Sequence, residues 1–133
     1  MIRNRVVAFV TGAGLLLASM TLVAHHSVSA EFDTTKKVTF TGTVKKVDWM
    51  NPHIYTHVEV KQPDGKVIVY RVEGGPPNAL YRQGIRPESL PPGTVVVCTD
   101  CNRSKSPDSM NVNGTLRLPD GRPALGVYNA PEK

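Results

Sequence analysis

The feature that most constrains the fold is a hairpin pattern in the middle of the chain. Residues 53–61 and residues 66–72 both place apolar side chains at every second position. This period of two is typical of a β-strand with one face toward a core. Between the two segments, the sequence Gln-Pro-Asp-Gly at residues 62–65 supplies the Asp-Gly pair of a tight turn. The pattern therefore predicts an antiparallel hairpin.

Further elements are expected on both sides of this hairpin. Residues 37–47 are rich in Thr and Val, which suit a strand. Residues 78–83, which are followed by Gly84, predict a short helix. Residues 94–98 form an apolar run of the kind found in buried strands. A Pro-Asp-Gly turn within residues 118–121 predicts a final hairpin.

The order of these elements predicts a mainly β protein. Three strands, one short helix and then two or more strands is the order of a small Greek-key barrel of the oligonucleotide/oligosaccharide-binding (OB) type. We therefore expect an OB-like barrel of about five to six strands with one short helix. A two-sheet β-sandwich is the alternative, which strand counting does not exclude.

The amino terminus has the pattern of a secretory signal peptide. Arg3 and Arg5 precede the uncharged residues 6–23, and small residues follow. An uncleaved anchor is the alternative, because the stretch approaches the length of a bilayer span. Cleavage is expected after Ala24, with an alternative cut after Ala30. The protein is thus expected to be periplasmic or secreted, and to contact the membrane only through an uncleaved signal.

With cleavage after Ala24, we expect the chain to have four parts. A signal peptide (1–24) precedes a mature amino-terminal segment (25–36), a single β-barrel domain (37–128) and a disordered tail (129–133). One domain is what a chain of this length holds. The formal net charge of +5 comes from dispersed basic residues, so nucleic acid is not an expected partner. The sequence does not determine the oligomeric state.

A set of short motifs follows in order along the chain. They are Ala24-His25-His26-Ser27, Glu31-Phe32-Asp33, Gly42-Thr43-Val44 running to Trp49, Asn51-Pro52-His53, Asn78-Ala79-Leu80 with Arg82 and Gly84, Pro91-Pro92-Gly93 and Leu118-Pro119-Asp120-Gly121-Arg122. Together they resemble a family of small secreted bacterial proteins, domain of unknown function 6152. The resemblance implies an exported, barrel-like single domain without an established activity. It covers His25, His26 and His53, whereas His57 and the Cys98–Cys101 pair depart from the family pattern.

The histidines suggest a metal site, and all four of the chain belong to this hypothesis: His25, His26, His53 and His57. A cut after Ala24 would free the α-amine of His25, which can chelate a metal together with its own imidazole. Copper is the first choice, because these nitrogen ligands suit Cu(II). Zinc is less favoured, because a closed structural zinc site normally has four strong ligands.

Strand alternation places Tyr55 and Glu59 on the same face as His53 and His57, where they would support or weakly ligate the metal. The alternative is that the amino-terminal pair is a solvated chain end, that His53 caps a turn and that His57 is a surface residue.

Cys98 and Cys101 are expected to form a local structural disulfide, because an exported protein enters an oxidising compartment. A metal-binding or redox-active dithiol is the alternative. A thioredoxin-like pair, however, belongs to a βαβ unit, whereas this pair ends a predicted strand.

The sequence favours a binding protein over an enzyme, since it contains no hydrolytic triad, phosphate loop or paired-carboxylate motif. The leading hypothesis is an exported protein that holds a transition metal. The alternative is a metal-free OB-like interaction module. It would bind an envelope glycan, peptide or partner protein through rings such as Trp49 and Tyr55.

Overall fold

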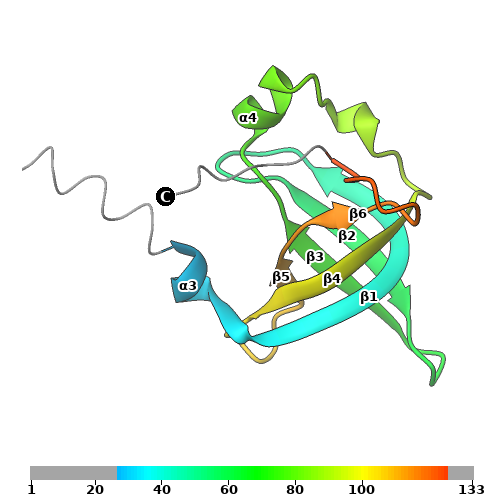
Figure 1. Cartoon of the computed structure of the whole chain (residues 1–133). Coiled ribbons are helices and arrows are strands. Elements are labelled where there is room, and N and C mark those ends of the chain that lie inside the picture. The colour runs from blue at the N-terminus through cyan, green and yellow to red at the C-terminus, as the bar shows by residue number, and fades with distance from the viewer. Residues whose placement is uncertain (1–26, 126–133) are drawn as a thin grey trace, which may run out of the picture. The chain divides into compact units, whose positions relative to one another are not determined.

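The computed structural model describes residues 27–125 (Figure 1). The expected signal peptide and disordered tail therefore lie outside the described residues. In chain order the elements are the helix α3 (Ser27–Glu31), the strands β1 (Phe32–Asp48), β2 (Tyr55–Lys61) and β3 (Val67–Glu73), the helix α4 (Pro77–Arg82), the 3-10 helix η1 (Pro87–Ser89), and the strands β4 (Val95–Ser104), β5 (Asn111–Asn113) and β6 (Leu116–Arg117). Among these residues, no helix is both long and apolar enough to span a bilayer.

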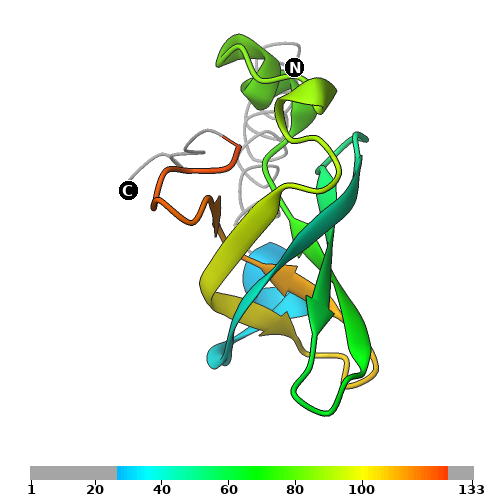
Figure 2. The ribbon, with the colours of Figure 1, turned by 90° about the vertical axis from the view of Figure 1, so that its right-hand side faces the viewer.

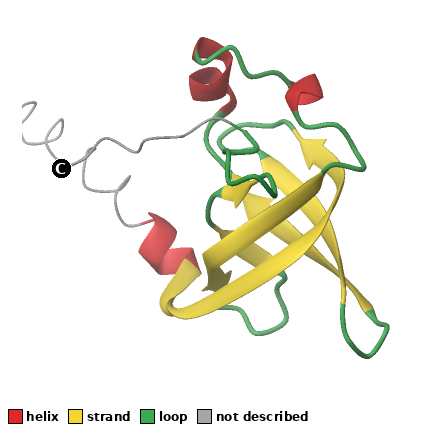
Figure 3. Cartoon of the chain, turned by 45° about the vertical axis from the view of Figure 1, so that its right-hand side comes forward, coloured by secondary structure: helices red, strands yellow, loops and turns green. Residues whose placement is uncertain are grey.

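All strands belong to one compact unit that begins at Phe32, and they form a single sheet in the order β1-β2-β3-β5-β4-β6. Because β1 also pairs with β4, five of the strands close into a barrel-like ring (Figure 3). The pairings are antiparallel except for β3 with β5. The prediction of a mainly β, barrel-like fold is confirmed, although the ring is not a regular barrel. A single sheet favours this description over the two-sheet sandwich.

Strand β1 pairs with two different strands and so closes the ring. Its first part pairs with β4 and its last part with β2, and Thr43 has a partner on each of them, Val95 and Glu59. At this corner the chain needs Gly42. A Cβ atom there would lie 2.5 Å from the carbonyl oxygen of Glu59, which is backbone and has little freedom to move.

A β-bulge in β1 explains why two core residues three positions apart face the same way. The pairing with β2 shifts between Val44 and Lys46, which leaves Lys45 as an extra residue. One extra residue reverses the alternation, so Val44 and Val47 both turn toward the core. This bulge explains why these valines are three residues apart in the sequence rather than two.

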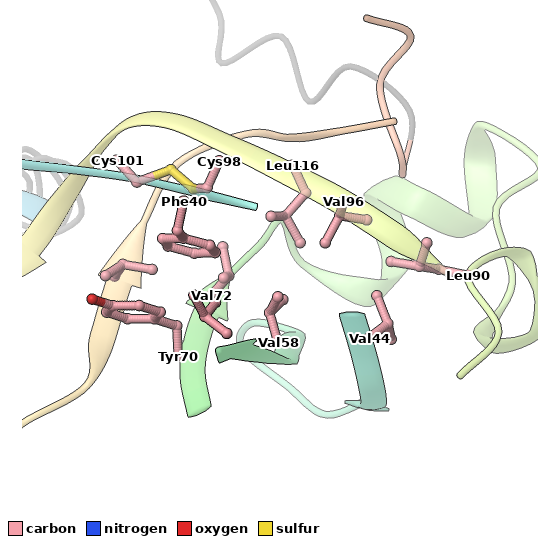
Figure 4. Packing of buried hydrophobic residues seen from close by; sticks show 12 residues of the cluster. Phe40, Val44, Val58, Tyr70, Val72, Leu90, Val96, Cys98, Cys101 and Leu116 are labelled. Carbon is pink, nitrogen blue, oxygen red and sulfur yellow. A yellow bond between two sulfur atoms is a disulfide. The ribbon is translucent and has the colours of Figure 1, made fainter. Parts of the chain in front are cut away.

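The core consists of two clusters. The larger fills the ring, and Phe40 and Tyr70 stack within it at 4.3 Å between ring centroids (Figure 4). The smaller consists of Ile54, Leu80 and Ile85, with Trp49 and Leu125 packed against it. The helices α4 and η1 lie together beyond one end of the strands, which places this second cluster there (Figure 2).

Two local expectations differ from the structure. Strand β1 begins at Phe32 rather than at Lys37, because Phe32 is buried and the polar residues after it form an irregular stretch of the pairing with β4. The turn at residues 118–121 is present, with Leu118 N–H donating to the Arg122 carbonyl at 2.7 Å. Its returning arm, however, is a single bridge between Arg117 and Pro123 rather than a strand.

Candidate functional site

His53 lies just before β2 and is held against the segment that follows β3. Its Nδ1 is 3.1 Å from the carbonyl oxygen of Gly74. A carbonyl only accepts hydrogen bonds, so Nδ1 carries the proton and donates it. In the neutral ring this leaves the lone pair on Nε2. The imidazole is therefore both oriented and fixed in one tautomer.

The backbone around this contact is tightly joined. Gly74 N–H donates to the Ile54 carbonyl at 2.9 Å, and Ile54 N–H donates to the Gly75 carbonyl at 3.2 Å. A Cβ at position 74 would lie 2.8 Å from Cγ1 of Ile54, whose side chain is buried. Glycine is thus required where these two segments approach each other, and this approach positions His53.

Glu73 brings a buried carboxylate to His53. Its side chain is only 7% exposed, and its Oε1 is 3.8 Å from Nδ1 of His53. Its Oε2 accepts a hydrogen bond of 3.4 Å from the Tyr55 hydroxyl, across the β2–β3 pairing. Glu73 is not among the residues that the sequence pattern predicts for the site. Counting back from the predicted turn would have found it, because the hairpin register places residue 73 opposite residue 55.

Tyr55 is further fixed by Arg71. The guanidinium carbon of Arg71 lies 3.6 Å from the centroid of the Tyr55 ring, a cation–π contact from the neighbouring strand. The expected polar face of β2 therefore exists and continues onto β3. It joins His53, Tyr55, Glu73 and Arg71 through direct contacts.

His57 belongs to a different group on the same face. Its Nε2 is 2.7 Å from Oδ2 of Asp48, and Oδ1 of Asp48 is 2.8 Å from the Lys46 ammonium. The hydrogen bond from Lys46, followed by that from His57, lowers the pKa of Asp48 below its ordinary value. Glu59, two residues further along β2, pairs with Lys45 at 3.0 Å.

The structure thus gives His53 and His57 separate partners rather than one shared site. Within residues 27–125, no three His, Cys, Asp or Glu side chains are grouped so that they could hold a metal ion. His25 and His26, the other half of the predicted site, lie outside the described residues.

Trp49 belongs to the second core cluster and not to the polar face of β2. Its ring is 5.5 Å from that of Tyr81 at an angle of 59°, and Arg86 lies over the same tyrosine at 4.9 Å. The indole Nε1 of Trp49 is buried and has no hydrogen-bond partner among the described residues. A buried donor without an acceptor is uncommon in native proteins.

A family model with the description "Family of unknown function (DUF6152)" matches residues 13–113 of the 133. The chain belongs to this family. The resemblance inferred from the ordered motifs is therefore confirmed. No curated protein and no solved structure matches the chain. Membership in DUF6152 consequently carries no activity with it, and the function of this member has to be argued from its own residues.

In this DUF6152 protein, Cys98 and Cys101 are joined by a disulfide within the single strand β4 (Figure 4). Their pairing partners on β1 are Phe40 and Val38, so β4 contains one extra residue here. Asp100 has a positive φ of 52°, and its N–H donates to the Thr39 hydroxyl at 3.0 Å. This bulge turns both cysteines toward the core, where each is fully buried. The expected cysteine pairing is confirmed.

Proposed function

We propose that the protein is an exported binding protein that holds a transition metal, with copper as the first choice. One observation carries this proposal, namely the hydrogen bond from Nδ1 of His53 to the Gly74 carbonyl. Histidines that bind metals almost always donate their second ring N–H to a carbonyl or carboxylate, which fixes the ring and raises its basicity. His53 has this arrangement, and its Nε2 would be the ligand atom.

The remaining ligands would come from the amino terminus. After cleavage behind Ala24, His25 would offer its α-amine and one imidazole nitrogen, and His26 lies next to it. Together with His53 these give nitrogen ligands of the kind that Cu(II) prefers. His57 also donates a ring N–H, in its case to Asp48, but it belongs to a separate group of side chains and is therefore left out of the set around His53. Zinc remains less favoured, since a closed site would need a fourth strong ligand.

Glu73 supports the same assignment by its charge. A carboxylate beside the His53 ring favours positive charge at this point of the surface. Its burial keeps that charge less screened than an exposed one would be. The proposed role is metal carriage, buffering or protection in the periplasm or outside the cell, and no catalytic step is assigned to it.

The test is a copper titration of the exported chain, after its amino terminus has been established by intact mass. We expect a single Cu(II) bound with submicromolar affinity, and loss of this binding in His53→Ala. His57→Ala is the matched control, an imidazole on the same face that is expected to bind copper as the unchanged protein does. Chain that starts at His25 and takes up no copper would overturn the proposal, as would unchanged binding in His53→Ala.

A second candidate rests on a different observation. Among the described residues the indole donor of Trp49 has no acceptor, and its ring lies beside Tyr81, which is 40% exposed. A metal-free module could bind an envelope glycan, peptide or partner protein here by stacking. It predicts retention on purified envelope material in the presence of a chelator, unchanged in His53→Ala and lost in Tyr81→Ala. Loss of retention on chelation alone would favour the metal instead.

A further inference from the structure

Part of β3 has an open backbone edge. The strand pairs with β2 along its whole length, but with β5 only from Arg71 to Glu73. Within the described part of the chain, residues 67–69 therefore have a strand on one side only. This segment belongs to the end of the β2–β3 hairpin that extends beyond the other strands (Figure 3). Unpaired edges are templates for pairing with another strand.

The hydrogen-bonding direction along β3 shows which groups face this edge. Gln62 N–H donates to the Lys66 carbonyl at 2.7 Å, so this pair bonds across the hairpin. Arg71 N–H points to the other side, where it donates to the Met110 carbonyl at 3.1 Å. Directions alternate along an antiparallel ladder. Val67 and Val69, which have the same parity as Arg71, therefore direct their N–H and C=O groups away from β2.

The side chains of the same two residues are exposed and apolar. Val67 is 54% exposed and Val69 is 41% exposed, whereas Tyr70 beside them is turned into the core. Solvated charged side chains would discourage pairing at an edge, but here the outward positions are valines. Open backbone groups and apolar side chains thus coincide at two residues.

We propose that this edge pairs with the same edge of a second copy of the chain, antiparallel about a two-fold axis at Ile68. The register between the two copies follows from which residues of β3 have no described strand on their outer side. Arg71 is already used by β5, so Val67 of one copy lies opposite Val69 of the other, and the reverse. Each of these pairs exchanges both backbone hydrogen bonds. The interface is self-complementary, as a symmetric dimer requires.

The flanking charges agree with this pairing. On β2, Lys61 lies opposite Val67 and Glu59 lies opposite Val69. Across the joined sheets, one row of outward side chains runs Glu59, Val69, then Val67 and Lys61 of the second copy. Each row of valines is therefore flanked by one acidic and one basic residue, and no like charges face each other. This register therefore brings no like charges together, and the apolar pairs meet without electrostatic repulsion.

The experiment is sedimentation equilibrium of the full chain over a range of concentrations, with chelator present so that metal-bridged association is excluded. Because the paired edge is short, the interface is small and the dimer weak. We expect the mass to rise from one chain toward two as the concentration approaches roughly 1 mM. Amide exchange at Val67 and Val69 should slow in parallel, whereas exchange at other exposed amides should not.

Val69→Lys places a charge in the apolar row and is expected to remain a single chain at every concentration. Val95→Lys is the matched control, because Val95 is 43% exposed and lies on β4, away from this edge. It adds the same charge and should associate as the unchanged protein does. A constant mass of one chain for the unchanged protein would overturn the inference. So would association of Val69→Lys equal to that of the unchanged protein.

Discussion

The ring of His53 donates a hydrogen bond of 3.1 Å to the carbonyl of Gly74, 21 residues further along the chain. The contact exists because the segments before β2 and after β3 approach so closely that a side chain at position 74 would meet Ile54. A backbone constraint thereby sets the orientation of the proposed metal ligand. The proposed function depends on this hydrogen bond. It can be tested by changing Gly74 and, separately, by changing Glu73, the carboxylate beside the His53 ring.

Gly74→Ala should lower stability and weaken copper binding together. The added methyl would lie 2.8 Å from Cγ1 of the buried Ile54, so one of the two segments has to move. We expect a loss of about 1–3 kcal/mol in the free energy of unfolding. Urea denaturation measures this loss. Copper titration below the unfolding midpoint should show weaker binding. Unaltered copper affinity in a destabilised variant would contradict the prediction that the approach at Gly74 positions the ligand.

Glu73→Gln should weaken copper binding while leaving the fold in place. The amide retains an oxygen that can accept from Tyr55 but removes the negative charge beside His53. Because this charge lies 3.8 Å from Nδ1 of His53 without being its hydrogen-bond acceptor, we expect the Kd for copper to rise by up to about tenfold. Glu59→Gln is the control, since that carboxylate pairs with Lys45 and is 39% exposed. Equal affinities for the two variants would argue against a role for Glu73.

The disulfide should resist reduction in the folded protein. Cys98 and Cys101 are fully buried beneath the bulge of β4, so a thiol reductant has no direct access to either sulfur. Intact mass after alkylation should show reduction in urea but not in buffer. Cys98→Ala combined with Cys101→Ala should lower the free energy of unfolding by at least about 2 kcal/mol, through the loss of the short closed loop and of buried side-chain volume. Rapid reduction without denaturant would instead indicate a redox-active pair.

Asp48 should make a pH-dependent contribution to stability. Hydrogen bonds from Lys46 and then His57 lower the pKa of its carboxyl below the ordinary 3.8, so folding favours the charged form. This stabilisation is present above that ordinary value and is lost as the pH falls through the lower pKa of the folded state. The advantage over Asp48→Asn, at most about 1 kcal/mol for such a solvated group, should shrink in acid. Urea denaturation of both proteins across this range measures it, and a constant difference would contradict the assignment.

The alternating hairpin was the part of the fold most readily predicted, because period-two patterning and the Asp-Gly turn agree on one register. That register places Tyr55 opposite Glu73 and His57 opposite Arg71. The contacts of the polar face were therefore implicit in the sequence. What the pattern could not supply was the close approach at Gly74, which depends on how two segments outside the strands pack together.

The bulges were beyond prediction from alternation alone. Val44 with Val47, and Cys98 with Cys101, are each three residues apart, a spacing that puts regular strand residues on opposite faces. In the structure each strand contains one extra residue, and this bulge turns both members of each pair toward the core. The start of β1 was missed for a related reason, because the polar residues after Phe32 interrupt the pattern that identifies the rest of the strand.

Strand β1 is shared by the two sides of the ring, and this has a consequence for the order of folding. Its partner β2 follows within a few residues, whereas Lys37 meets Asn102 only 65 residues later. Pairing between neighbours can begin as soon as the hairpin has emerged, but closure must wait until β4 is complete. A newly synthesised chain would therefore carry half of β1 unpaired during that interval, the period in which chaperones or proteases would meet it.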